Sequence, residues 1–264
     1  EGFETTRNML QAISLLFGDI AKQNGIAHPK WRHMSLSIQV DGLSTVNVPL
    51  PSGGIVALRL DLLQHKVVIK TSREYLKEIS LTDGLSLAEI AGSIISDVHD
   101  LGLQGEFTKS AYDEPKSGYD PERATAFFCT FVEVERLFRI HLSKLDPASP
   151  VQLWPHGFDL SCEWYGARIE EWEENGQLNT MPTQLNLGFY PGNNNVDSYF
   201  YSNPWPFDET KLLDKKLPAG ARWHTEGWKG TILPYTELLN DENTDNRLLQ
   251  FAAAVYEIAA PTLN

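Results

Sequence analysis

The hydrophobic residues of the first segment recur with the period of a helix. They form one stripe at a spacing of three or four residues, made of Met9, Ile13, Leu16, Phe17 and Ile20. Thr5 or Thr6 is available to cap the start, and Asn24 with Gly25 supplies a C-terminal stop. The pattern therefore predicts an amphipathic helix over residues 5–25.

A strict alternation follows, which is the pattern of a strand. Apolar residues occupy every second position from 34 to 40, namely Met34, Leu36, Ile38 and Val40. Three more β-type segments cover residues 44–50, 55–62 and 66–71, and short connections join them. Such connections favour an antiparallel meander, because parallel strands need long crossovers.

Two helices are marked by their N-terminal residues. Ser86 and Glu89 have the spacing of a capping box, which predicts a helix over residues 86–102. Asp120 and Pro121 fit the N-cap and first positions of a helix that runs to about residue 145.

The rest of the chain completes the element order. Residues 105–112 read as a strand, residues 151–235 as strands and loops, and residues 246–260 as a last helix that ends before Pro261.

Runs of strands flanked by separate helices predict an α+β fold, mainly an antiparallel sheet with about four α-helices packed on it. The two halves have a loosely similar order, without a repeat at the level of residues. We expect residues 1–264 to form a single domain, and residues 113–120 are the place where it would subdivide.

Composition narrows the class of protein. The net charge of −13 argues against nucleic acid and against an anionic membrane surface as partners. No apolar run reaches the roughly 20 residues of a membrane helix. The two cysteines, Cys129 and Cys162, are too few for a disulfide framework, and the chain begins without a signal pattern, so we expect a cytoplasmic protein.

Candidate chemistry concentrates in the second half. Six of the seven tryptophans lie there, at Trp154, Trp164, Trp172, Trp205, Trp223 and Trp228. Alternation from residue 158 puts Leu160, Cys162 and Trp164 on one face and Asp159, Ser161 and Glu163 on the other. Pro155 and Gly157 interrupt the pattern, which predicts a bend that aims His156 independently of the strand.

Several separated motifs resemble one known family. They are HPKWRHMSLSIQVDGLST at 28–45, WPHGFDL at 154–160, LGFYPG at 187–192, SYFYSNPWPF at 198–207 and TILPYTELL at 231–239. Together they are similar to a bacterial family catalogued as domain of unknown function 5996, over nearly the whole chain. The resemblance implies no activity, substrate or cofactor. It leads us to expect an acid around Thr183 and Gln184, where this chain has none.

The motif positions shared with that family mark residues of interest without giving them roles. They are Trp31, His33, Trp154, His156, Phe158, Asp159, Gly188, Phe189, Tyr190, Pro191, Tyr201, Pro234 and Tyr235.

The sequence gives only weak evidence for a conventional catalytic or metal site. His156, Asp159 and Glu163, with His224 or Glu226, offer suitable ligand types for a metal, but neither HExxH nor paired CxxC motifs are present, so we assign no metal. An acid/base hydrolase would need a pair such as Asp159 and Glu226 at a working separation. Cys162 lies on the apolar face and no GxSxG elbow exists. Whether the protein is an enzyme, and which cofactor it uses, stays open.

Two functional hypotheses remain beside the simpler one that the rings only fill a core. The first is a pocket for a small molecule of unknown identity in the C-terminal half. Its expected residues are Trp154, His156, Asp159, Tyr190, Tyr201, Trp223 and Glu226, with Trp31, His33 and Tyr235 as secondary candidates. The second is a protein-interaction or self-assembly module that uses an exposed aromatic patch at residues 198–207. The sequence leaves the oligomeric state open.

Overall fold

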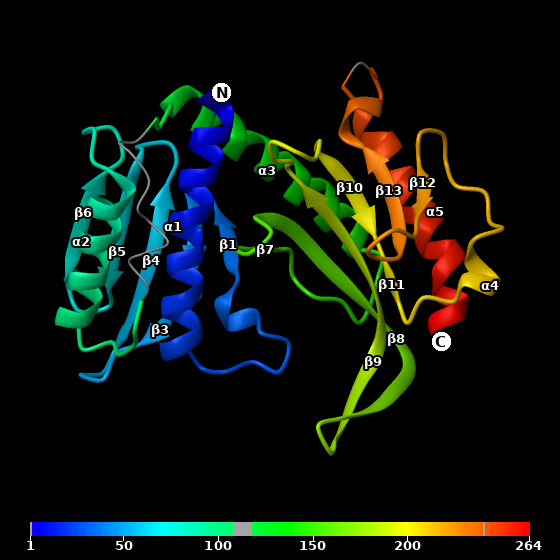
Figure 1. The fold of residues 1–264 in the computed structure, drawn as a ribbon, viewed down its shortest axis with the longest axis horizontal. Helices are drawn as coiled ribbons and strands as arrows, with labels where there is room; N and C mark the ends of the chain where they lie inside the picture. The colour runs from blue at the N-terminus through cyan, green and yellow to red at the C-terminus, as the bar shows by residue number, and fades with distance from the viewer. Residues whose placement is uncertain (1, 108–117, 240) are drawn as a thin grey trace. The chain divides into compact units, whose positions relative to one another are not determined.

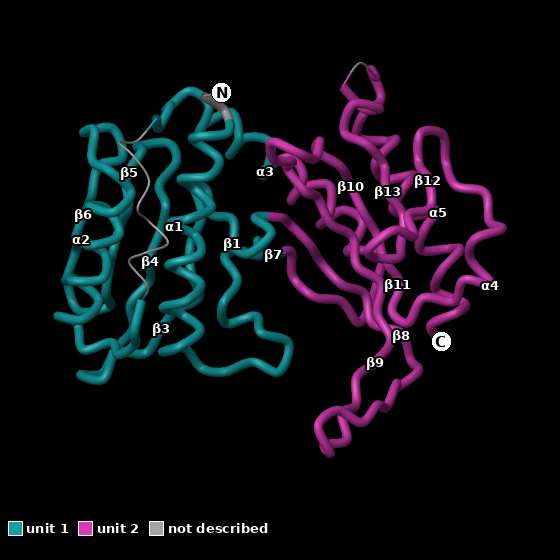
Figure 2. The backbone as a smooth tube through the Cα atoms, viewed as in Figure 1, with its two compact units in different colours: residues 1–132, 152–158 teal, residues 133–151, 159–264 magenta. Residues whose placement is uncertain are grey.

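The structure, a computed structural model, describes residues 2–107, 118–239 and 241–264. Over these residues the chain forms five α-helices and thirteen strands, and the described strand pairs are antiparallel (Figure 1). The predicted α+β class is thus confirmed. The chain divides into two compact units (Figure 2): unit 1 holds residues 1–132 and 152–158, and unit 2 holds residues 133–151 and 159–264. The expectation of a single domain stays a prediction.

Unit 1 is a meander with helices packed on it. Its strand order is β7-β1-β2-β4-β5-β6, with β3 on β4. The bounds are β1 Leu36–Gln39, β2 Gly42–Thr45, β3 Val48–Pro49, β4 Ile55–Asp61, β5 Lys66–Thr71, β6 Leu76–Ser80 and β7 Gln152–Trp154. The helices are α1 (Gly2–Asn24), with its predicted stripe buried, and α2 (Leu87–Asp100), with the predicted Ser86–Glu89 capping box.

Three strand predictions in unit 1 need correction. Met34 belongs to the 3-10 helix η1 (Arg32–Met34), and Val40 lies in a turn with 91% of its surface exposed, so only the middle of the 34–40 segment forms β1. Strand β6 was missed because Ile79 alone is buried in it, which gives no alternation. Of the strand predicted at 105–112, residues 105–107 have no regular structure, and the remainder lies outside the described residues.

Unit 2 has the strand order β12-β13-β10-β9-β8, with β11 on β9. The bounds are β8 Asp159–Glu174, β9 Gln177–Tyr190, β10 Tyr199–Ser202, β11 Pro204–Trp205, β12 Arg222–His224 and β13 Gly230–Pro234. The second half of α3 (Pro121–Leu142) and all of α5 (Thr244–Leu263) pack on one face, where Phe138 meets Phe200 and Tyr256 meets Trp164. We call this the covered face; α4 (Glu209–Leu212) contacts α5.

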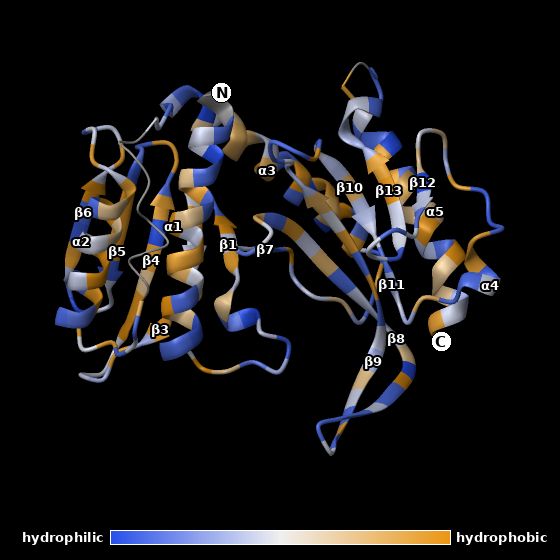
Figure 3. Cartoon of the chain, in the orientation of Figure 1, coloured by the Kyte–Doolittle hydropathy of each residue, from blue (hydrophilic) through white to orange (hydrophobic). Residues whose placement is uncertain are grey.

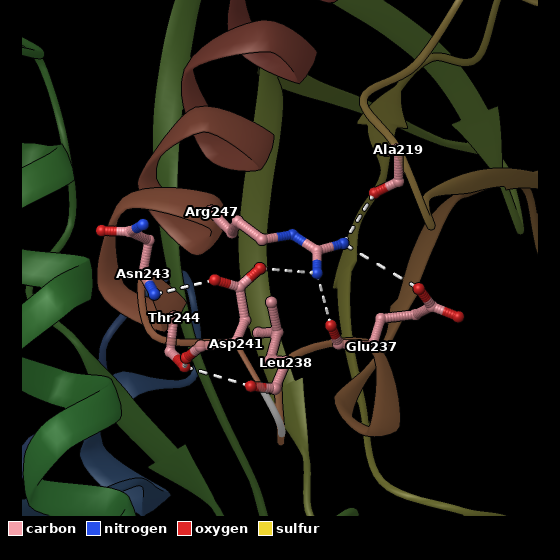
Figure 4. A network of polar contacts seen from close by, with 7 residues as sticks. All are labelled: Ala219, Glu237, Leu238, Asp241, Asn243, Thr244 and Arg247. Atoms are coloured by element: carbon pink, nitrogen blue, oxygen red, sulfur yellow. Dashed lines mark hydrogen bonds and ion pairs between the residues drawn. The ribbon is translucent and has the colours of Figure 1, made fainter.

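The last helix is held at both ends. At its start Arg247 donates to the carbonyls of Glu237 and Ala219 and pairs with Asp241, which ties α5 to two loops (Figure 4). At its end the helix passes through Pro261 and continues to Leu263, so the predicted stop before Pro261 is wrong. Side chains satisfy carbonyls of this last turn, because Thr183 donates to Leu263 and Thr262 donates to Ala259.

Candidate functional site

The bend predicted after Trp154 is a four-residue turn. Phe158 closes it with a left-handed φ of 54° and donates its backbone N–H to the Trp154 carbonyl at 2.8 Å. The His156 side chain is exposed, with its ring 6.2 Å from that of Trp154, and its carbonyl accepts from Gln11 Nε2 at 2.9 Å. His156 and Trp154 belong to unit 1, which fixes His156 through its backbone and leaves the imidazole in solvent.

Beyond the turn, β8 alternates as predicted. Leu160, Cys162 and Trp164 are at most 6% exposed on the covered face, whereas Asp159 and Glu163 are half-buried on the opposite one. The alternation therefore separates core side chains from candidate chemistry within a single strand.

The face opposite α3 and α5 carries a continuous line of rings, which we call the aromatic row. Neighbouring ring centroids along it are 5.3, 6.1, 6.0 and 4.5 Å apart. All its members are half-buried. In order they are Tyr190 from β9, Tyr199 and Tyr201 from β10, Trp228 from the β12–β13 loop and His224 from β12.

Tyr201 connects the row to a carboxylate two strands away. Its register partner on β9 is Gly188, which in turn pairs with Ser161 on β8. The Tyr201 ring lies over Gly188, where a Cβ would come within 2.1 Å of the ring. The hydroxyl thereby reaches across β9 and donates a hydrogen bond to Asp159. A glycine is required here for close approach, not for an unusual backbone angle.

The environment keeps these phenols protonated. Burial of the hydroxyl, reinforced by the Asp159 carboxylate, raises the pKa of Tyr201 well above its ordinary value. Burial also raises the pKa of Tyr199, with Tyr190 and Asp159 adding to the effect. The face therefore presents neutral hydroxyl donors beside the half-buried carboxylates of Asp159 and Glu163.

Three other predicted pocket residues of unit 2 are not members of the row. Trp223 pairs with Thr231 and so points to the covered face, where its Nε1 donates to the Lys215 carbonyl at 3.0 Å. Tyr235 packs on Phe189 and Phe200, which belong to the same covered face. Glu226 is exposed in the loop between β12 and β13.

The two secondary candidates of unit 1 form a separate pair. Trp31 and His33 stack with centroids 5.8 Å apart, and the Nδ1 of His33 accepts the backbone N–H of His28 at 3.1 Å. His33 is buried, while Trp31 is 56% exposed.

The pocket expected from the sequence left out four residues of this face: Tyr199, Trp228, His224 and Gly188. Tyr199 carried a usable signal, because it alternates with Phe200 and must share the face of Tyr201. Gly188 was marked only as a motif position shared with the family, without a role, and Trp228 carried no signal, since both roles depend on which strands become neighbours.

The covered face holds a small cavity of about 10 Å³, which is room for about one water molecule. His141, Cys162 and Ser202 are among its lining residues. Burial, together with the charge of Lys144, lowers the pKa of His141 to about 4. Burial raises the pKa of the Cys162 thiol. Both groups are therefore neutral near pH 7, and this cavity is too small for a metabolite.

The two positions expected to carry an acid have different surroundings. Thr183 is fully buried and its hydroxyl donates to a carbonyl at the end of α5, which a carboxylate could not do. Gln184 is half-buried and pairs with Tyr165 and Trp205 across the sheet.

The aromatic patch expected at residues 198–207 is not exposed as predicted. Phe200 is 2% exposed, and the other four rings of the segment are half-buried. These four are Tyr199, Tyr201, Trp205 and Phe207.

Among the residues that the structure describes, no three His, Cys, Asp or Glu side chains gather so as to hold a metal ion. Nor does any helix among them have the length and apolar character to cross a membrane.

Comparison with known proteins gives one family, whose function is unknown. Neither the curated proteins nor the solved structures contain a match to this chain. A family model described as a family of unknown function, DUF5996, matches residues 1–264. The chain belongs to the DUF5996 family.

Proposed function

We propose that unit 2 binds a small molecule at the aromatic row and that this molecule carries an amine or quaternary ammonium group. The observation that supports the proposal is the Asp159 carboxylate, which accepts a hydrogen bond from a ring of the row, Tyr201. Ring faces attract cations through their quadrupoles, most strongly where water is partly excluded. A carboxylate at the same place adds direct Coulomb attraction.

The charges on this face favour a cation over an anion. Glu163 lies two positions after Ser161 on the same side of β8 and adds a second half-buried carboxylate. The raised pKa of Tyr201 keeps its hydroxyl neutral, so it does not compete as an anion and remains a donor. An anionic ligand would meet two negative groups here.

The alternative, that the rings serve only as core, fits this face poorly. Core rings of the covered face such as Phe189 and Phe200 are 2% exposed, whereas each ring of the row is half-buried and all five carry a polar atom. Such amphipathic rings suit a surface that is partly wet and partly apolar.

The test uses choline as the probe and its neutral isostere 3,3-dimethylbutan-1-ol as the comparison. We expect choline to raise the melting temperature with concentration and the neutral alcohol to do so at least ten-fold less potently. Asp159→Asn should abolish the choline effect, whereas Asp214→Asn, which removes an exposed carboxylate of unit 2, should preserve it. Equal responses to the two probes, or an unchanged response in Asp159→Asn, would refute the proposal.

A further inference from the structure

Strands β8 and β9 continue beyond the strands beside them. β10 pairs with β9 at residues 188–190 and β11 at residues 184–185, while residues 177–182 pair with β8 (Figure 1). We call residues 167–180 the hairpin arm. A two-stranded ribbon of this kind has open edges, and open edges are sites of association unless something covers or blunts them.

The arm exposes apolar side chains on its outer face. Ile169 is 55% exposed and Leu178 is 65% exposed, and the pairing of residues 169–174 with 177–182 puts both on one face. The opposite face carries Trp172, whose ring packs edge-on against Trp205 at 5.6 Å. Trp172 is thus in contact with β11 of the same unit, whereas Ile169 and Leu178 are each more than half exposed.

Acidic residues surround these apolar side chains. Glu171 and Glu173 share the face of Ile169, and Glu170 and Glu174 lie on the other. The single cation of the arm, Arg168, already pairs with Glu170 at 2.8 Å. In Figure 3 this part of the hairpin carries both hydrophilic (blue) and hydrophobic (orange) residues. An occupant of the outer face must therefore combine apolar contact with positive charge.

Unit 1 offers a surface of that chemistry, residues 22–33, which we call the basic corner. The sequence from residue 20 to residue 40 contains no Asp or Glu but contains Lys22, Lys30 and Arg32. Two large apolar side chains are exposed there, Ile26 at 78% and Trp31 at 56%.

The backbone of Trp31 has an unusual, left-handed conformation. Trp31 has a left-handed φ of 57°, which non-glycine residues rarely adopt and which often marks functional positions. Its ring stacks on His33, and Lys22 Nζ lies 5.6 Å from the ring centroid. Desolvation and the positive charge of Arg32 lower the pKa of the nearby His28, which is consistent with a positive local field.

Another cationic segment of the chain carries carboxylates that pair with its own lysines. Lys211 pairs with Asp208 at 3.1 Å and Lys215 pairs with Asp214 at 3.3 Å. Residues 22–33 of the basic corner contain no Asp or Glu.

We propose that the hairpin arm of one copy of this chain docks on the basic corner of a second copy. Ile169 and Leu178 cover Trp31 and Ile26, while Glu171 and Glu173 meet Lys22 and Arg32. The contact is heterologous, so each bound copy keeps one free arm or one free corner, and the assembly grows with concentration unless it closes into a ring. The inference does not depend on the aromatic row.

Sedimentation velocity of the full chain tests this. We expect the average mass to rise with protein concentration at about 20 mM salt and to fall toward the monomer at about 500 mM, where charge attraction is screened within a few ångströms. Glu171→Lys/Glu173→Lys and Lys22→Glu/Arg32→Glu should each weaken association at least ten-fold. Trp31→Ser, which leaves the charge unchanged, should weaken it as well. Lys211→Glu/Lys215→Glu, with the same change in charge elsewhere, should not.

Mixing the two charge-reversed variants gives the decisive result. Each pair of substitutions shifts the net charge of −13 by four, to −9 for the arm variant and −17 for the corner variant, so both stay negative and have no general attraction. An equimolar mixture should nevertheless recover association, because a reversed arm meets a reversed corner and a native arm meets a native corner. A wild-type chain that stays monomeric at all concentrations would overturn the proposal, and so would a mixture that stays monomeric.

Discussion

The two faces of the unit 2 sheet are built from the same strands but treat polar groups in opposite ways. On the covered face, Phe189 and Phe200 are almost fully buried, and burial keeps His141 and Cys162 neutral. On the opposite face, Tyr201 keeps its hydroxyl and uses it to hold the Asp159 carboxylate. The covered face thus keeps its titratable groups neutral, whereas the opposite face holds a hydrogen-bonded carboxylate.

Successive residues of one strand therefore have unrelated roles. Phe200 belongs to the core, while its neighbours Tyr199 and Tyr201 belong to the aromatic row. The difference follows from the two-residue period of a strand, and it predicts that neighbouring substitutions will separate stability from binding.

The largest effect is expected from Phe200→Ala. The ring contacts Phe138, Phe189 and Tyr235, so its removal leaves a cavity and should lower the free energy of unfolding by about 3–5 kcal/mol. Tyr199→Ala, one position away on the half-buried face, should cost less than about half as much. Urea unfolding of both variants measures the difference, and equal losses would show that the two faces are not energetically distinct.

His141 gives a pH-dependent test of the covered face. Its pKa is lowered from 6.5 to about 4 by burial, so the unfolded chain binds a proton in this range before the folded chain does. Stability from this group is complete above pH 6.5 and is lost as the pH falls toward 4, by up to about 3 kcal/mol. His141→Phe should remove this part of the slope of unfolding free energy against pH. The same slope in both proteins between pH 4 and 6.5 would contradict the assignment.

The sequence correctly predicted those elements that depend on interactions between residues close together in the chain. The capping box at Ser86, the boundaries of β5 and the two faces of β8 all follow from spacing within a few residues. Edge strand β6 did not, because one buried residue, Ile79, leaves no period to detect.

The candidate site depends on long-range pairing, which is why the sequence predicted it only in part. Asp159, Tyr190 and Tyr201 were expected to line one pocket, and they lie on one face of the sheet. Trp228 reaches that face only because β13 lies next to β10. Trp223 was expected beside them and instead points to the other side, since β12 pairs with β13 in a register that puts it opposite Thr231.

The smallest effect, and the most specific to the aromatic row, is expected at Gly188. A methyl group there would come within 2.1 Å of the Tyr201 ring, so Gly188→Ala should displace the ring, break its hydrogen bond to Asp159 and cost about 1–3 kcal/mol. The reason is the neighbouring ring and not the backbone. In a Tyr201→Ala background the same substitution should therefore cost nothing or stabilise slightly, because alanine loses less conformational freedom than glycine in a strand. A double-mutant cycle by urea unfolding measures this coupling, and Gly188→Ala costs that are equal in the two backgrounds would show that Gly188 does not position Tyr201.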